Sequence, residues 1–128
     1  MSFLESTILL PIRLNNPFLD TMFPSVGSVD AVLDTGYSGF VLVPQEIFLQ
    51  LGFDQLVHKR SRAVLADGRR IELRGSYGSI VFKESLTVDG LVETNRDITE
   101  VLLGVDGIRK LVLTIDSCRR KIIIETCA

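Results

Sequence analysis

The sequence predicts a mainly β domain, a closed or nearly closed barrel with one or two small helices. Short runs of aliphatic and β-branched residues recur along the chain and are separated by Gly, Pro, Asp and Asn. Asp67-Gly68 stands between two such runs, and this arrangement is the strongest short-range signal for a β-hairpin. The length of 128 residues suits one packed core, so we expect a single domain over residues 1–128.

The expected strands are short and follow one another closely. They cover residues 7–14, 29–33, 40–43, 63–66, 69–73, 78–82, 86–88, 101–103, 113–115 and 121–124. Pro11, inside the first run, indicates an edge position or a bulge because proline has no N–H to donate. The polar, proline-containing stretch 15–28 predicts a loop.

Two short segments carry helix signals. Pro44 suits a first helical position, apolar residues follow at helical spacing as far as Leu51, and Gly52 can end the helix. The second segment, residues 106–111, predicts a single short helix before the last two strands.

Composition and charge exclude several classes of function. The net charge of −2 gives no electrostatic footprint for nucleic acid or for an anionic membrane. The N-terminal residues lack the basic region of a signal peptide, and no apolar run is long enough to span a bilayer. We therefore expect a cytoplasmic protein that binds neither nucleic acid nor membrane.

The metal-ligating residue types are too few for a zinc site. The chain has one histidine, His58, and two cysteines, Cys118 and Cys127, which form no CxxC pair. We interpret the cysteines as partly buried free thiols in a reducing compartment. The sequence thus predicts no metal and no cofactor.

One motif carries chemistry. An apolar strand ending at Leu33 runs directly into Asp34-Thr35-Gly36, and Ser38 follows two residues later. The pattern places a carboxylate on a tight loop among backbone N–H groups and two hydroxyl groups. Such surroundings orient an aspartate and hold its protonation state.

In this context the chain resembles the retropepsin-like, single-lobe aspartic proteases, and in particular their cellular branch. The resemblance rests on Asp34-Thr35-Gly36 after an apolar strand, the Asp67-Gly68 hairpin, and Val101-Leu102-Leu103-Gly104 before a short helix, in that order. It covers roughly Ile8 to Ile124. It implies a closed retropepsin-like β-barrel with a flap hairpin, and the activity of an aspartic endopeptidase acting on a peptide or protein substrate.

The resemblance also assigns roles to residues of the Asp loop. Asp34 matches the catalytic aspartate, and Thr35 matches the hydroxyl that braces the two active-site loops across a dimer axis. Gly36 matches the residue whose backbone approaches the substrate. Ser38 matches a position that supports the Asp loop.

Two further segments match the family pattern. One is the flap tip, formed by Ala66, Asp67 and Gly68. The other is the segment that packs beneath the Asp loop, formed by Leu102, Leu103 and Gly104. Retroviral members place an Arg after that last glycine and pair it with an Asp, whereas this chain has Val105 and Ser38 at the two positions. Both halves of the ion pair are thus replaced together.

A single Asp-Thr-Gly implies two chains. Peptide hydrolysis of this kind needs two facing carboxylates that share one proton, as the aspartic proteases illustrate. The chain is too short for two lobes, so we expect a homodimer with one Asp34 from each copy. Asp106 and Asp116 also follow apolar runs, but the first suits a helix N-terminus and the second a turn.

Two other hypotheses remain open from the sequence. The same barrel could be a non-catalytic dimerisation or peptide-binding module that retains the Asp loop for structure. It could also be a domain that becomes active only with a partner chain or a flanking segment.

Overall fold

The computed structural model describes residues 2–4, 7–56, 58–64, 67–83 and 86–127. Its strands, in chain order, are β1 (Ser2–Leu4), β2 (Thr7–Asn16), β3 (Thr21–Phe23), β4 (Val29–Leu33), β5 (Val41–Pro44), β6 (Lys59–Val64), β7 (Arg70–Lys83), β8 (Leu86–Asn95), β9 (Val101–Leu103), β10 (Leu111–Asp116) and β11 (Lys121–Thr126). Its helical segments are α1 (Gln45–Gln50), the 3-10 turn η1 (Phe53–Gln55) and α2 (Val105–Ile108).

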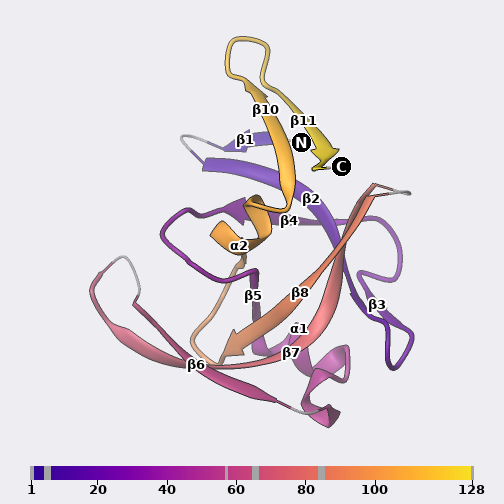
Figure 1. The fold of residues 1–128 in the computed structure, drawn as a ribbon, viewed down its shortest axis with the longest axis vertical. Coiled ribbons are helices and arrows are strands. Elements are labelled where there is room, and N and C mark those ends of the chain that lie inside the picture. The colour runs from indigo at the N-terminus through magenta and orange to yellow at the C-terminus, as the bar shows by residue number, and fades with distance from the viewer. Residues whose placement is uncertain (1, 5–6, 57, 65–66, 84–85, 128) are drawn as a thin grey trace.

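The main sheet closes on itself as a barrel (Figure 1). Its ring runs in the order β2, β4, β9, β5, β8 and β7, and it closes where β7 pairs with β2. Strands β1 and β3 pair with β2 outside the ring, and β6 extends the sheet beyond β7. Strands β10 and β11 form a separate two-stranded sheet at the top of Figure 1. The predicted fold class, a closed retropepsin-like β-barrel with short helices, is confirmed.

Strand β9 lies between β4 and β5, although both precede it in the chain. It runs parallel to β4, with Leu33 beside Leu103, and antiparallel to β5. The segment 34–40, which joins β4 to β5, must therefore pass around the carboxyl end of β9. This crossing sets Asp34 beside the end of β9, and Tyr37 and Gly39 against the start of α2.

Alternation along the strands divides the apolar side chains between two clusters. The larger cluster fills the barrel, and there Phe48 of α1 meets Phe53 with 5.4 Å between the ring centres. Neighbouring residues of a strand point to opposite faces, so Leu42 of β5 turns outward between the inward-facing Val41 and Val43. The smaller cluster on this outer face is formed by Tyr37, Leu42, Ile71 and Leu73.

Several expected elements differ in extent from the observed ones. The stretch 15–28, expected as a loop, contains the end of β2 and all of β3. The two strands expected at 69–73 and 78–82 are one continuous strand, β7. Gly75 and Gly78 lie within this strand. A Cβ added at Gly75 would collide with Leu91, and one added at Gly78 would collide with Phe53. The lack of a side chain at both positions therefore allows close packing.

Pro11 and the cysteines also differ from expectation. Strand β2 is an interior strand of the sheet. On one side, β1 pairs with its residues up to Leu9 and β7 pairs with its residues from Arg13 onward, so neither pairs with Pro11. Pro11 therefore pairs with β4 alone, which suits a residue without an N–H. Cys118 and Cys127 are both free and exposed, not partly buried, because they lie in the β10–β11 turn and just after β11.

None of the helices in the described part of the chain is long and apolar enough to cross a membrane.

Candidate active site

The Asp34 carboxylate stands where β4 ends. Its backbone N–H donates to the carbonyl of Leu103 (3.0 Å), so the loop starts in register with β9. Its Oδ1 accepts the N–H of Gly36 (2.8 Å), and its carbonyl accepts the N–H of Tyr37 (3.3 Å). These bonds form a tight Asx turn that fixes the half-buried side chain.

The far side of the loop is held by the turn that enters α2. The N–H groups of Gly104, Val105 and Asp106 donate to the carbonyls of Phe40 (3.0 Å), Tyr37 (2.8 Å) and Gly39 (3.0 Å). At Gly104 an added Cβ would collide with the backbone of this loop, so a glycine is needed for the close approach. The structure thus places the Leu102, Leu103 and Gly104 segment directly against the loop that carries Asp34.

Three of the sequence-predicted loop residues lie on its outer surface. Thr35, Gly36 and Ser38 are exposed. Neither hydroxyl forms a hydrogen bond with another residue in the described part of the chain. Both hydroxyl groups are therefore available at the surface of the loop.

Tyr37 points the opposite way, into the smaller cluster. Its hydroxyl donates to Oε1 of Glu93 on β8 (2.5 Å), and Ser61 of β6 donates to the other carboxylate oxygen. Tyr37 is 6% exposed and Glu93 is 4% exposed. Burial, then the hydrogen bond and charge of Glu93, and finally the charge of Asp106 raise the pKa of the Tyr37 phenol well above its ordinary range. The phenol is thus a fixed donor.

This network connects three elements, and sequence reasoning did not identify it. Tyr37 belongs to the Asp loop, Glu93 to the barrel wall, and Ser61 to the first strand of the flap hairpin. The one sequence signal for this network was Glu93 itself. A charged residue directly after Leu91-Val92 in an apolar strand indicates a buried carboxylate that needs hydrogen-bond donors. Residue spacing could not identify its two donors.

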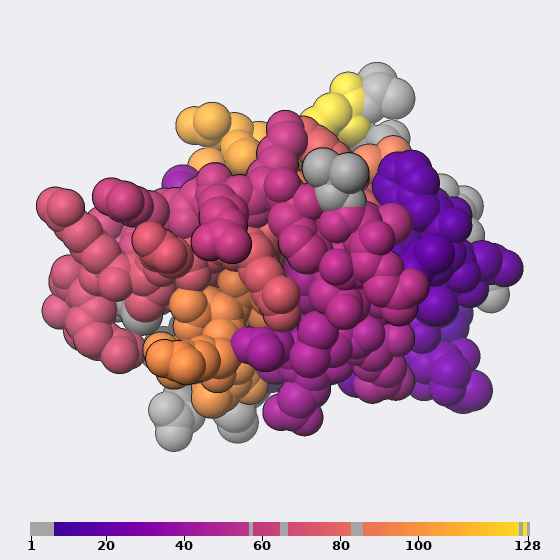
Figure 2. All heavy atoms as spheres, turned by 90° about the horizontal axis from the view of Figure 1, so that it is seen from below, coloured from indigo at the N-terminus to yellow at the C-terminus, as the bar shows by residue number. Residues whose placement is uncertain are grey.

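The flap hairpin is formed by β6 and the first part of β7. The strands pair from Lys59 opposite Gly75 to Val64 opposite Arg70. In Figure 2 the hairpin (pink) stands beside the segment that follows β8 (orange). Ile71 and Leu73, opposite Ala63 and Ser61, pack with Tyr37, so the middle of the hairpin rests on the Asp loop.

In the described part of the flap turn, Asp67 bonds to Arg69. Asp67 accepts the backbone N–H of Arg69 (3.0 Å) and forms a 2.7 Å ion pair with its guanidinium. The first of these bonds, helped by the second, lowers the pKa of Asp67. Gly68 has φ of +86°, a conformation that favours glycine. Ala66 lies outside the described residues, and within the described part of the chain no hydrogen bond joins Asp67 or Gly68 to the Asp34 loop.

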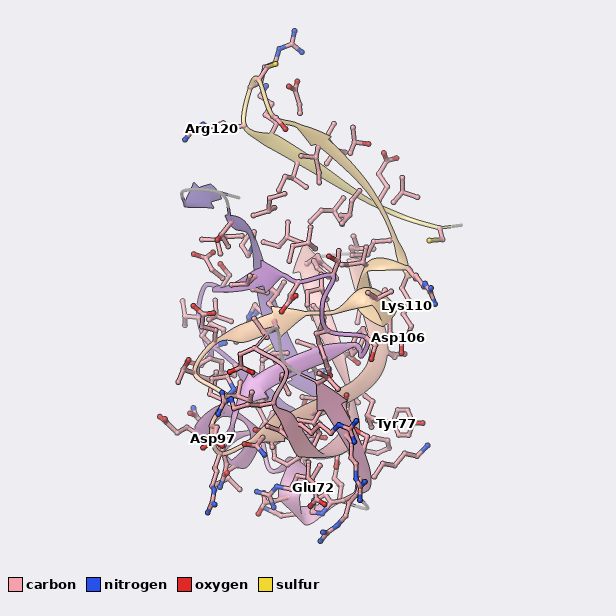
Figure 3. All side chains as sticks on the ribbon, turned by 90° about the vertical axis from the view of Figure 1, so that its left-hand side faces the viewer. Glu72, Tyr77, Asp97, Asp106, Lys110 and Arg120 are labelled. Atoms are coloured by element: carbon pink, nitrogen blue, oxygen red, sulfur yellow. The ribbon has the colours of Figure 1, made fainter. Side chains whose placement is uncertain are left out.

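Asp116 and Asp106, the other acids considered from the sequence, lie in the β10–β11 hairpin and in α2. Asp116 pairs with Arg119 (3.5 Å) in the β10–β11 hairpin, whose tip carries Arg120 in Figure 3. Asp106, labelled on the barrel in the same figure, lies in the first turn of α2. Across the described ranges, no three His, Cys, Asp or Glu side chains gather as a possible metal site.

Three comparisons with known proteins concern the sequence and the fold of this chain. No family model matches the sequence. Over 126 residues the chain is 41% identical to an uncharacterized protein of Archaeoglobus fulgidus, covering 98% of each. The crystal structure of a retropepsin-like aspartic protease from Rickettsia conorii matches with a TM-score of 0.57 and 20% identity, over 95% of each chain. At that identity the likeness shows the fold, which is retropepsin-like.

Proposed function

This chain belongs to one family with the uncharacterized Archaeoglobus fulgidus protein and has a retropepsin-like fold, and we propose that it is an aspartic endopeptidase. In this proposal it acts as a homodimer, and each copy contributes one Asp34. Its substrate is an extended peptide or protein segment, and it uses no metal and no cofactor.

The position of Asp34 is the observation that supports the proposal most strongly. Its carboxylate is half-buried on a loop held by backbone hydrogen bonds on both sides, with Leu103 at its start and Val105 at its far end. A group that must act on a bond has to be held rigidly, and backbone bonds do this without adding charge. The exposed Thr35 and Gly36 leave the adjacent surface open to a second copy.

The need for two carboxylates favours a dimer. The sequence contains one Asp-Thr-Gly, and Asp116 is paired elsewhere. A two-fold axis beside the loop would bring the two Asp34 side chains face to face. Two close carboxylates share one proton, as in aspartic proteases in general, because a pair of adjacent negative charges is unfavourable.

Apolar residues on the β10–β11 hairpin support an interface with a second copy. Val112 is 44% exposed and Ile123 is 51% exposed, although both lie in strands whose other face, with Ile122 and Ile124, is buried. Their face also carries Thr114 and Glu125, and exposed apolar side chains on it are stabilised when another surface covers them. A second copy of this hairpin is the covering surface that two-fold symmetry provides.

The proposed reaction uses the two Asp34 groups in complementary states. The ionised carboxylate takes a proton from water, whose oxygen attacks the scissile carbonyl carbon, while the protonated carboxyl gives its proton to the carbonyl oxygen. The adduct collapses when the C–N bond breaks. The nitrogen receives the proton that the first Asp34 had taken, and the second Asp34 recovers one from the adduct. The pair ends with one shared proton.

In this mechanism the flap hairpin covers the bound peptide. An extended substrate would pair through its backbone, as a strand does, beneath β6 and β7. The network of Ser61, Glu93 and Tyr37 would then keep the middle of the hairpin at a fixed distance from the Asp loop.

A mixed peptide library tests the proposal. It would be incubated with the wild type and with Asp34→Asn between about pH 4 and about pH 7, where a carboxyl pair can hold one proton. We expect cleavage by the wild type, none by the variant, and an activity per molecule that rises with protein concentration at high dilution. Cleavage that survives Asp34→Asn would contradict the proposal. A folded, dimeric wild type that cleaves nothing would instead favour a peptide-binding module.

A further inference from the structure

A recess in the surface is lined by residues outside the Asp34 loop. It has a volume of about 490 Å³ and is bordered by β6, β7, the end of β8 and the start of α1. None of the residues that line it belongs to the 34–40 loop, to β9 or to α2. Figure 2 shows this face, with the flap strands on one side and the segment after β8 on the other.

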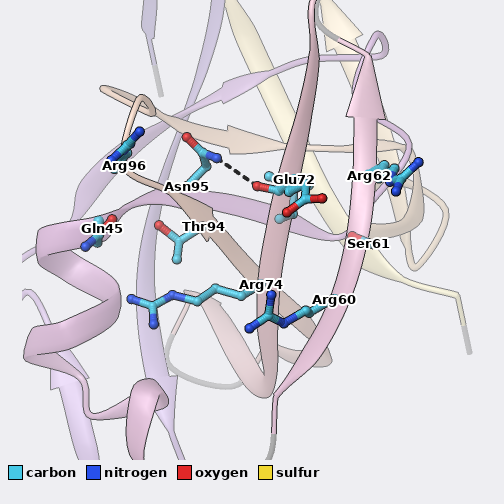
Figure 4. A pocket seen from close by; sticks show the side chains of 10 residues that line it. Gln45, Arg60, Ser61, Arg62, Glu72, Arg74, Thr94, Asn95 and Arg96 are labelled. Atoms are coloured by element: carbon cyan, nitrogen blue, oxygen red, sulfur yellow. Dashed lines mark hydrogen bonds between the residues drawn. The ribbon is translucent and has the colours of Figure 1, made fainter.

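Arginines dominate the lining of this recess. Arg60, Arg74 and Arg96 come from three different segments, and Arg62 contributes from the far side of β6. In Figure 4 the side chains of Arg60 and Arg74 extend in the same direction, with Arg74 reaching toward α1, whereas Arg62 points to the other side of β6. Glu72 is the one acidic residue of the lining. A chain of net charge −2 thus concentrates positive charge here.

These guanidinium groups have no anionic partner in the described part of the chain, where the ion pairs are Asp67–Arg69 and Asp116–Arg119. Three of the four neutral polar side chains of the lining are, by contrast, already bonded. Ser61 donates to Glu93, Thr94 to the carbonyl of Val43, and Asn95 to the carbonyl of Glu72. Apart from Gln45 and the Glu72 carboxylate, the unused hydrogen-bonding groups of the lining are therefore cationic.

Part of the recess is held in place before any ligand arrives. Arg74 is half-buried and its guanidinium lies 5.3 Å from the centre of the Phe48 ring, which restricts its motion. The amide oxygen of Asn95 accepts the N–H of Asp97, so this corner is fixed as well. A guanidinium fixed in this way binds carboxylate with little loss of side-chain entropy.

The backbone beside the recess indicates the shape of the ligand. Strand β6 is at the edge of the sheet, and its outer side pairs with no strand among the described residues. Three consecutive residues of it, Arg60, Ser61 and Arg62, line the recess, so its main chain borders the recess as well as its side chains. An exposed strand edge with free N–H and C=O groups binds an extended peptide.

We propose that this recess is a docking site for an acidic, extended peptide segment, whose carboxylates bind Arg60, Arg74 and Arg96. The identification of that segment as part of a protein substrate, outside the bond to be cleaved, rests on the proposed function. The site would select substrates that carry acidic residues beside the cleaved segment, and would hold them against the outer side of the flap.

The full chain with Asp34→Asn, which removes cleavage from the measurement, is the protein to test. The probe is a labelled peptide that alternates glutamate with threonine, and its matched control has glutamine in place of glutamate. By fluorescence anisotropy at low salt we expect the glutamate peptide to bind at least about ten-fold more tightly, with binding that weakens as salt is added. Equal binding of the two peptides would overturn the proposal.

Variants then locate the binding. Arg60→Glu combined with Arg74→Glu should abolish it, and the exposed Arg96→Glu alone should weaken it several-fold without a risk to folding. Arg119→Glu combined with Arg120→Glu is the matched control, because Arg120 lies at the opposite end of the molecule from Glu72 in Figure 3. The assignment would be contradicted if Arg96→Glu left the binding of the glutamate peptide unchanged. It would also be contradicted if the control variant weakened that binding as much as the recess variants do. Preferential displacement by a single-stranded oligonucleotide would assign the recess to nucleic acid instead.

These outcomes are independent of catalysis. A wild type that cleaves no peptide but binds the glutamate peptide at Arg60, Arg74 and Arg96 would refute the proposed function and leave the docking site standing. A wild type that cleaves peptides but shows no selective binding of the glutamate peptide would support the proposed function and refute the docking site.

Discussion

The Tyr37 hydroxyl donates a 2.5 Å hydrogen bond to the Glu93 carboxylate, across 56 residues of sequence. Ser61 donates to the other oxygen of the same carboxylate, so one buried acid ties the Asp loop to the first strand of the flap hairpin. In the described part of the chain no cation pairs with Glu93. Its desolvation is offset by two hydroxyl donors, and the removal of either should be costly.

Tyr37→Phe should therefore destabilise the protein by about 1–3 kcal/mol, because Glu93 would keep its burial and lose a donor. The free energy of unfolding in urea, measured at one protein concentration, checks this. Tyr77→Phe is the matched control, since the Tyr77 hydroxyl accepts from Lys59 at the exposed surface. Equal losses in the two variants would contradict the role given to the Tyr37–Glu93 bond.

The same bond predicts a dependence of stability on alkaline pH. The pKa of Tyr37 is raised in the folded state, so the folded protein favours the protonated phenol. Its contribution is complete below the ordinary tyrosine pKa of about 10 and is lost as the pH rises through and beyond that value. The urea midpoint of the wild type should fall more steeply from about pH 9 to about pH 11 than that of Tyr37→Phe. Parallel curves would show that Tyr37 is not the group responsible.

Gly104→Ala should destabilise the protein by about 3 kcal/mol or more, because the new Cβ would overlap the backbone of the Asp loop. Gly27→Ala provides the comparison. Gly27 has φ of +78° but open space around it, so its cost should be limited to about 1 kcal/mol of backbone strain. Thermal unfolding of both variants measures the difference. A Gly104→Ala protein as stable as Gly27→Ala would show that the loop does not need this close approach.

Val112→Lys and Ile123→Lys should each weaken self-association by at least about ten-fold, because a charge would be placed on the proposed interface. Sedimentation at several concentrations measures the effect. Val26→Lys, at a position that is 85% exposed in the loop before β4, should leave the association unchanged. A dimer that tolerates lysine at Val112 and at Ile123 would contradict the proposal that the β10–β11 hairpin is the interface.

The local parts of this structure could be predicted from the sequence. Strands 29–33 and 101–103 match the observed β4 and β9, since each is a short apolar run bounded by strong turn residues. The Asp67-Gly68 pair marked the flap hairpin for the same reason. The helix expected at 45–51 is observed as α1 with Leu51 as its end and a left-handed Gly52 after it.

Features that depend on distant pairing could not be predicted. Strand β7 was divided in two because Gly75-Ser76 interrupts its apolar alternation, and only the packing of Leu91 and Phe53 over its glycines explains why it continues. The acid network around Glu93 needs donors that lie 56 and 32 residues away. Residue spacing holds no information about which hydroxyl will meet a buried carboxylate.

The most direct test of the central claim is a mixing experiment that asks whether two copies share one site. Wild type and Asp34→Asn would be mixed at constant total protein, allowed to exchange subunits, and assayed on a cleaved peptide. If both Asp34 carboxylates are required, an equal mixture should retain about one quarter of the wild-type activity, because about one quarter of randomly formed pairs carry two aspartates. An activity of about one half would show that each chain acts alone and would contradict the shared Asp34 site.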